Sequence, residues 1–243
     1  MIELARHASP HGAIRILERR SDGARMYNQA GALQTLAYAD GTSLFGYVHA
    51  IELLVCDAKR ILILGGAGGS LATMLARRGC VVTVVDIDPN AERLARTYFA
   101  LDPRVTWVTG DAFQFVEDTT ATFDAIVVDA FDAHGLARAF THADGIQKSA
   151  PLLAPHGKLL VNLAGFDGPV DYGWPLACTL AAQGWRATLL RAVDGWEGNE
   201  LLWVSRAGHA PALDLADLME RPAEARTYLL SLKPFAAPHE TPP

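Results

Sequence analysis

From Arg60 onward, two patterns of apolar and polar positions take turns along the chain. Short runs of aliphatic residues alternate with stretches in which apolar residues recur every three or four positions. The runs predict seven strands, at 61–64, 81–85, 105–108, 125–128, 158–162, 187–191 and 201–205. The stretches between them predict helices near 70–78, 89–99, 111–117, 143–153 and 172–183. Because the strands are apolar on both faces, the pattern favours an α/β fold with a doubly wound, mostly parallel seven-stranded sheet.

The first 41 residues follow a different pattern. Three candidate strands, 13–18, 25–28 and 32–37, are separated by the turn signals Ser21-Asp22-Gly23 and Gln29-Ala30-Gly31. This arrangement predicts a small N-terminal β-meander over 1–41. A second unit, 42–221, begins with a helix over 42–56 and contains the large sheet. Residues 222–243 are expected to form a C-terminal tail, because they end in a proline-rich stretch.

Composition narrows the class of protein. The chain is 50% apolar and 20% charged, which is ordinary for a domain that buries a large core. Its net charge is −6 and it has no block of Lys and Arg, so we do not expect a nucleic-acid partner. Cys56, Cys80 and Cys178 lack metal-ligand spacing, and no metal site is expected. The chain shows no apolar leader and no membrane-spanning run, which favours a cytoplasmic protein without a membrane partner.

Glycine or aspartate follows four consecutive strands of the predicted sheet. The run Gly65-Gly66-Ala67-Gly68-Gly69 follows the first strand, and Asp86, Asp111 and Asp129 follow the next three. In such sheets ligands bind at the carboxyl ends of the strands. Glycines let backbone approach a ligand closely, and a carboxylate about 20 residues further on suits ribose hydroxyls. The acid after the third strand suits the exocyclic amine of an adenine.

Simpler explanations exist for each feature alone. Glycine-rich turns also serve as tight connections, and Asp111 could cap the helix that follows it. Four such strand ends in series are hard to attribute to capping. No anchor beyond the backbone follows the glycines, which argues against a dinucleotide diphosphate. The sequence therefore predicts a Rossmann-like, methyltransferase-type domain that binds an adenosine-containing co-substrate of the S-adenosylmethionine kind.

Ordered motifs over roughly 25–205 resemble the spermidine synthase family of polyamine aminopropyltransferases. They are Arg60-Ile-Leu-Ile-Leu-Gly-Gly-Ala-Gly-Gly69, Val85-Asp-Ile-Asp-Pro89, Tyr98-Phe-Ala-Leu-Asp-Pro-Arg-Val105, Gly110-Asp-Ala-Phe113 and Val127-Val-Asp-Ala-Phe-Asp132, with Gly31-Ala-Leu-Gln34 and Phe45-Gly-Tyr47 upstream. The resemblance implies aminopropyl transfer from decarboxylated S-adenosylmethionine to a polyamine or related amine, in a homodimer.

The same resemblance implies roles for individual residues. Asp129 corresponds to the family's catalytic carboxylate, and Asp132 to a second acid in the same loop. Tyr47 corresponds to a position that lines the amine pocket. Independently of the resemblance, the aromatic residue Phe131 is expected to line the same pocket, because it lies in the loop after the fourth strand. The positions expected to hold the nucleoside co-substrate are Gln34, Gly65, Gly66, Gly68, Asp86, Ile87, Asp111 and Ala112.

Three positions depart from the family pattern. Gly68 stands where the family has an aspartate that holds the donor's amine, Val48 replaces a Gln, and Ala133 replaces a Pro. Two further hypotheses therefore stay open. One is a methyltransferase that uses S-adenosylmethionine on an unknown small molecule, and the other is a non-catalytic nucleoside-binding homologue.

The roles of the residues that follow Asp129 have alternatives of their own. Asp132 could serve as a helix cap, leaving Asp129 to act alone. His134 and His142 are alternative bases, ranked below Asp129.

Overall fold

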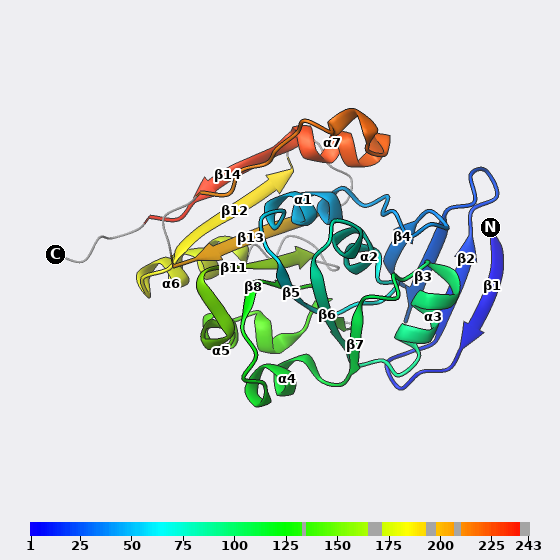
Figure 1. The fold of residues 1–243 in the computed structure, drawn as a ribbon, viewed down its shortest axis with the longest axis horizontal. Helices are drawn as coiled ribbons and strands as arrows, with labels where there is room; N and C mark the ends of the chain where they lie inside the picture. The colour runs from blue at the N-terminus through cyan, green and yellow to red at the C-terminus, as the bar shows by residue number, and fades with distance from the viewer. Residues whose placement is uncertain (133–134, 165–171, 193–197, 207–209, 239–243) are drawn as a thin grey trace.

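The computed structural model describes residues 1–132, 135–164, 172–192, 198–206 and 210–238. The large sheet has eight strands in the order β14-β12-β13-β11-β8-β5-β6-β7 (Figure 1). They are β5 (Arg60–Leu64), β6 (Val81–Asp86), β7 (Thr106–Thr109), β8 (Phe123–Val128), β11 (Leu153–Ala164), β12 (Arg186–Ala192), β13 (Asn199–Ser205) and β14 (Leu232–Ala236). The five strands from β11 to β7 pair in parallel, whereas β13, β12 and β14 add antiparallel. The predicted fold class is confirmed, with one strand more than the predicted seven.

Helices cover both faces of this sheet. They are α1 (Gly46–Leu54), α2 (Ser70–Arg77), α3 (Ala91–Tyr98), α4 (Ala112–Asp118), α5 (Ala143–Lys148), α6 (Gly173–Ala182) and α7 (Ala223–Ser231), with short 3₁₀ turns at Arg138–Phe140, Ala150–Leu152 and Leu218–Glu220. The predicted helix over 143–153 is divided at Ser149 into α5 and a 3₁₀ turn that contains Pro151. Proline removes a backbone donor, which explains the break.

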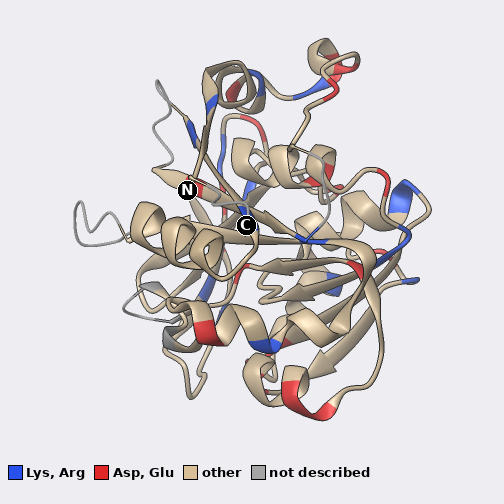
Figure 2. Ribbon diagram, turned by 90° about the vertical axis from the view of Figure 1, so that its left-hand side faces the viewer, with Lys and Arg blue, Asp and Glu red and all other residues tan. Residues whose placement is uncertain are grey.

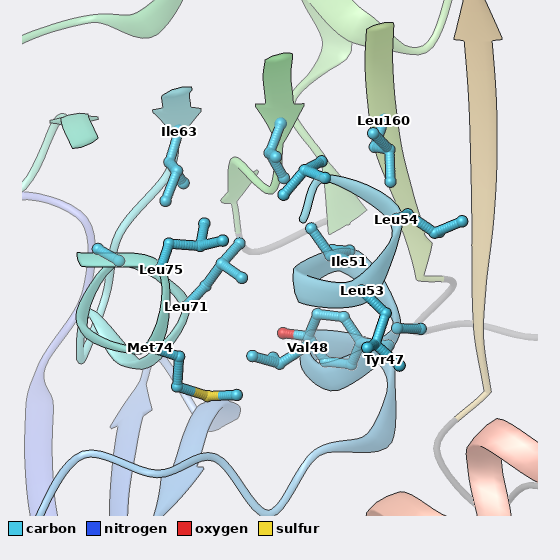
Figure 3. Packing of buried hydrophobic residues seen from close by; sticks show 14 of the residues in the cluster. Tyr47, Val48, Ile51, Leu53, Leu54, Ile63, Leu71, Met74, Leu75 and Leu160 are labelled. Carbon is cyan, nitrogen blue, oxygen red and sulfur yellow. The ribbon is translucent and has the colours of Figure 1, made fainter. Parts of the chain in front are cut away.

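Strand β5 shows why its residues are apolar without alternation. Ile61 and Ile63 pack into one cluster with α1, α2 and α7, whereas Leu62 and Leu64 pack into the other with α4, α5 and α6. Figure 3 shows the first cluster, in which Ile63 faces Leu71 and Leu75 of α2. Successive side chains of a strand point to opposite faces, so a strand covered on both sides has to be apolar throughout.

The N-terminal meander has four strands rather than the three predicted. Its order is β1-β2-β3-β4, with β1 at Ile2–His7, β2 at Ile14–Glu18, β3 at Arg25–Gln29 and β4 at Ala32–Ala37. Strand β1 is an exposed edge held by main-chain pairing to β2 and by the ion pair from Glu3 to Arg15 of β2. It carries no alternating apolar face, which is why its sequence gave no signal. A small core containing Tyr27 and Phe99 joins the meander to the α3 region.

Residues from 222 onward, expected as a tail, contain regular structure. Helix α7 packs on α1, and β14 pairs antiparallel with β12. Arg221 anchors the start of this segment, because its Nη1 donates to Oε2 of the buried Glu52 of α1 at 2.6 Å. Strand β14 is an edge strand that contains Pro234 and buries little. Proline at an edge and main-chain pairing leave no hydrophobic pattern in the sequence.

Charged side chains are spread over the molecule. Figure 2 shows Lys and Arg interspersed with Asp and Glu along the ribbon. Among the described residues, no helix is both long and apolar enough to cross a bilayer.

Candidate active site

A cavity of about 820 Å³ lies at the carboxyl ends of β5, β6, β8 and β11. The meander and the start of α1 form its opposite wall through residues such as Gln29, Leu33 and Phe45. Ten residues expected from the sequence line it: Gln34, Tyr47, Gly65, Gly66, Asp86, Ile87, Asp111, Ala112, Asp129 and Phe131. The fold thus brings together residues that lie about a hundred positions apart in the chain.

The glycine loop has a steric requirement at its first position. Gly65 has a φ of +93°, and a Cβ there would lie 2.2 Å from the carbonyl oxygen of Asp129. No other residue type fits this turn without displacing the β8 loop. The absence of a side chain lets the loop after β5 run directly beside the loop after β8, which is how Asp129 reaches the cavity.

Gly68 lies away from the cavity wall. Its backbone N–H donates to Thr35 Oγ1 at 3.0 Å, and a Cβ on Gly68 would lie 2.8 Å from Thr35 Cγ2. Among the described residues that line the cavity, Gly68 is not included. An aspartate at this position would therefore require Thr35 to move.

Asp86 is held by three backbone donors. Its Oδ2 accepts from the N–H groups of Gly66 and Ala67 at 2.8 and 2.9 Å, and its Oδ1 accepts from the N–H of Asp88 at 2.8 Å. A carboxylate has about four acceptor positions, so it can take further hydrogen bonds from hydroxyl groups in the cavity. The loop and the acid therefore fix each other.

Asp88 is a cavity residue that the sequence analysis missed. It is 2% exposed and accepts from Ser9 Oγ, from Gln29 Nε2 at 2.6 Å and from the N–H of Asn90 at 2.9 Å. Burial raises the pKa of Asp88, but these hydrogen bonds outweigh it and hold the pKa below its usual range. Ser9 and Gln29 belong to the meander, so Asp88 ties the meander to the end of β6. Its place in Asp86-Ile87-Asp88-Pro89 was the only available signal.

Asp129 lies half-buried in the cavity wall directly after β8. Its Oδ1 accepts from Asn162 Nδ2 at 2.7 Å, and the Tyr47 hydroxyl is its second hydrogen-bond partner. Burial raises the pKa of Asp129 to about 7, although both hydrogen bonds act in the opposite direction. A carboxyl group with such a pKa can accept or release a proton near neutral pH.

Two asparagines support Asp129 and were also missed. Asn162 is 1% exposed near the end of β11, and its Oδ1 accepts from Asn199 Nδ2 of β13 at 2.9 Å. Both residues line the cavity. A polar residue at the end of the apolar run 158–162 was the signal for Asn162, because buried amides need partners. Asn199 showed no such sequence signal, since its role depends on the pairing of β13 with β11.

Asp111 caps the helix that follows it, which is the simpler of the two roles that its position allows. It is the N-cap of α4, and its Oδ1 accepts from the N–H of Gln114 at 2.8 Å. It is also exposed at the rim of the cavity, so capping does not remove it from the site.

The loop after Asp129 is partly described. Asp132 ends β9 (Phe131–Asp132), which forms a short hairpin with β10 (Gly135–Leu136), so it does not cap a helix. The side chain of Asp132, together with Ala133 and His134, lies outside the described residues. His142 is the N-cap residue of α5 and is not among the described residues that line the cavity.

The cavity is acidic. Its described ionisable residues besides Tyr47 are Asp86, Asp88, Asp111, Asp129 and His11, and no described Lys or Arg lines it. Carboxylates on several sides of a partly enclosed space favour a cationic ligand. No group of three or more potential metal ligands occurs in the described part of the chain. A second hollow of about 590 Å³ lies at the opposite end of β11, where Arg206 covers the Trp185 ring, and the described residues that line it include no acid.

Comparisons with known proteins agree with this geometry. Residues 47–162 match the Spermine/spermidine synthase domain. Polyamine aminopropyltransferase 1 of Streptomyces coelicolor is 31% identical over 172 residues, which are 65% of this chain and 32% of that protein. The aligned part therefore spans about a third of the relative's length. The resemblance predicted from the motifs is confirmed.

Solved structures share the whole fold. A probable spermidine synthase from Corynebacterium glutamicum has a TM-score of 0.74 at 18% identity and covers 98% of this chain and 97% of its own. A spermidine synthase in complex with the transition state analogue AdoDATO has a TM-score of 0.71 at 17% identity and covers 95% of this chain and 84% of its own. At these identities the likeness establishes the fold alone.

Proposed function

Because residues 47–162 match the Spermine/spermidine synthase domain, we propose that this chain transfers an aminopropyl group from decarboxylated S-adenosylmethionine to a polyamine or related amine. The observation that carries the proposal is Asp129, a cavity carboxyl group with a pKa of about 7 among further aspartates. Both proposed substrates are cations, and the described wall of the cavity offers them acids without a competing Lys or Arg.

The reaction needs an unprotonated amine. Alkylammonium groups titrate near ~10, so the acceptor arrives protonated at neutral pH. Asp129 attracts the ammonium and accepts its proton, and the free amine then attacks the carbon beside the sulfonium. The new C–N bond forms as the C–S bond breaks, and the electron pair returns to sulfur, which leaves as the thioether methylthioadenosine. The leaving group is good, so the protein mainly positions the two substrates and removes the proton.

Asp86 and the glycine loop are suited to the nucleoside end of the donor. The remaining acceptor positions of Asp86 would bind the ribose hydroxyls, with Ile87 beside the base and Asp111 and Ala112 near its amine. Gln34 and Tyr47 line the opposite wall, toward the reacting groups. Asp132 stays a candidate second acid in the loop after Asp129.

Methyl transfer is the second candidate. Gly68 offers no carboxylate to a donor ammonium, and Thr35 occupies the space that such a side chain would need. The missing acid removes a repulsion toward the carboxylate of intact S-adenosylmethionine. The acidity of the remaining cavity outweighs this one position, because an anionic tail would meet no described cation there.

One experiment separates the functions. Purified protein is incubated with each donor and a diamine, and the nucleoside products are identified by mass spectrometry. We expect methylthioadenosine from the decarboxylated donor. By calorimetry, the intact donor should bind at least about tenfold more weakly than the decarboxylated donor, which is the effect of one uncompensated charge contact. S-adenosylhomocysteine as the only product would transfer the assignment to methylation. Binding of both nucleosides without any product would indicate a non-catalytic homologue.

A further inference from the structure

Tyr228 of α7 contacts both sides of the Asp129 site without lining the cavity. Its side chain is 2% exposed, and its hydroxyl donates to the carbonyl oxygen of Asn199 at 2.8 Å. It also packs on the bare Cα of Gly46, where an added Cβ would lie 2.2 Å from Tyr228 Cβ. Gly46 directly precedes Tyr47 in the first turn of α1. One side chain therefore touches the start of α1 and the start of β13.

Both contacts lead to the same carboxylate. From Asn199 the chain of hydrogen bonds runs through Nδ2 to Asn162 Oδ1 at 2.9 Å, and from Asn162 Nδ2 to Asp129 Oδ1 at 2.7 Å. From Gly46 the peptide continues into Tyr47, whose hydroxyl is hydrogen-bonded to Asp129. Asp129, Asn162, Asn199, Tyr228 and Tyr47 thus form a closed ring of contacts.

We propose that Tyr228 is a positioning residue that holds Asn162 and Tyr47 on either side of Asp129. This inference rests on the proposed function of the cavity as a catalytic site. An amide can present either its oxygen or its nitrogen to a neighbour, and the choice follows from its other partners. Asn199 donates to Asn162 Oδ1, so the nitrogen of Asn162 faces Asp129. Tyr228 in turn fixes the backbone of Asn199.

This positioning affects the pH at which the Asp129 carboxyl group loses its proton. Hydrogen bonds to a carboxylate favour its charged form, against the burial that disfavours it. Tyr47 is the titratable side chain in contact with Asp129, and no described Lys or Arg lines the cavity to compensate. If Asn199 loses its contact with Tyr228, it remains paired with β11, but its side chain holds Asn162 less firmly, and the Asp129 carboxyl group keeps its proton to higher pH.

The test replaces the hydroxyl alone, with Tyr228→Phe. The titration of Asp129 is followed by NMR of ¹³C-labelled aspartate, with the signal assigned through Asp129→Asn. We expect the midpoint to rise by roughly 0.5–1 pH unit, the size expected for weakening one hydrogen bond to a charged group. The acidic limb of the kcat/KM profile should move by the same amount. Affinity for methylthioadenosine should not change, because the Asp86 contacts do not pass through Tyr228.

Thr227→Val is the matched control. It removes an exposed hydroxyl that donates to the Ala223 carbonyl oxygen within α7, so it should leave the Asp129 midpoint unchanged. Asn199→Ala is the second variant, and it should raise the midpoint even if Tyr228→Phe does not fold. The double variant should shift no further than the larger single one, because both act through Asn162.

The outcomes separate this proposal from the proposed function. The NMR titration needs no turnover, so an inactive wild-type protein with a shifted midpoint would contradict the catalytic assignment and support the ring. An active wild-type enzyme whose Asp129 midpoint is the same in folded Tyr228→Phe and Asn199→Ala would overturn the positioning role. A shift in Thr227→Val of equal size would overturn it as well, because it would show a general effect of α7.

Discussion

Asp129 combines two opposing demands. The general-base role proposed for Asp129 needs a pKa near 7 at neutral pH, and burial raises its pKa to about 7. The same burial disfavours the charged form in the folded protein, whereas in the unfolded chain the group titrates near ~3.9. Between these values the unfolded state loses its proton while the folded state keeps it. Stability contributed by the neutral carboxyl is therefore complete below pH ~4 and is lost as the pH rises through about 7.

Asp129→Asn should remove the loss of stability that ionisation of Asp129 causes in the folded protein. The amide keeps the shape and cannot ionise, so at pH 8 the variant should be more stable than wild type by on the order of 3 kcal/mol. The gain should shrink to near zero at pH 4. Turnover should fall about 10²-fold or more, because the base is lost. Urea unfolding at both pH values and steady-state kinetics measure the two effects.

Asp217→Asn is a suitable control, since Asp217 is exposed and makes no side-chain cap bond. A stability gain for Asp129→Asn that is equal at pH 4 and pH 8 would contradict the assigned cause.

Asp86 is the residue on which nucleoside binding should depend most. Asp86→Ala removes the proposed partner of the ribose hydroxyls and leaves the N–H groups of Gly66 and Ala67 without their acceptor. Affinity for methylthioadenosine should fall by about 2–3 kcal/mol, the range for hydrogen bonds to a charged group. Calorimetric titration measures it, and undiminished affinity in a folded variant would remove Asp86 from the site.

At the scale of elements, the meander and the large sheet are joined by Asp88. The buried carboxylate receives Ser9 and Gln29 from the meander, and its pKa is held low by these bonds after burial has raised it. A depressed pKa means that the stabilisation is present above the ordinary value near ~4 and is lost only as the pH falls below it.

Asp88→Ala should weaken the contact between the meander and the large sheet. It leaves the buried donors of Ser9 and Gln29 unpaired, which should cost about 3 kcal/mol of unfolding free energy. Because His11 and Gly12 of the meander line the cavity, nucleoside affinity should fall too. Urea unfolding and calorimetry test both effects. Asp22→Asn, which removes the charge of a loop ion pair with Arg19 and keeps an acceptor for the Ala24 N–H, is the control and should change neither by more than about 0.5 kcal/mol.

The elements also differ in how visible they are in the sequence. Strand β5 was predictable because both of its faces are buried, which forces a run of apolar residues. Strands β1 and β14 were not, because each is an exposed edge held by main-chain pairing that leaves no side-chain pattern. Helix α7 turns only Ala225, Tyr228, Leu229 and Ser231 inward, too few for a clear stripe.

For the whole molecule, the site was predictable where it follows from strand ends. Asp86 and Asp129 are each the residue at or after the end of a parallel strand, so the fold class alone brings them to one edge. Asp88, Asn162 and Asn199 act through partners from distant segments, and a single sequence carries no record of those contacts. Asp111 shows a further limit, because one aspartate can cap a helix and line a cavity at once.

The residues of the ring around Asp129 are synthesised in a fixed order. A chain leaves the ribosome from its N-terminal end at about 5–20 residues per second, so the partners of Asp86, all within 66–88, are complete long before those of Asp129. Asn162 follows 33 residues after Asp129, Asn199 comes later, and Tyr228 comes last. The nascent protein therefore acquires the groups proposed to hold the nucleoside well before the Asp129 carboxylate has its full set of hydrogen-bond partners.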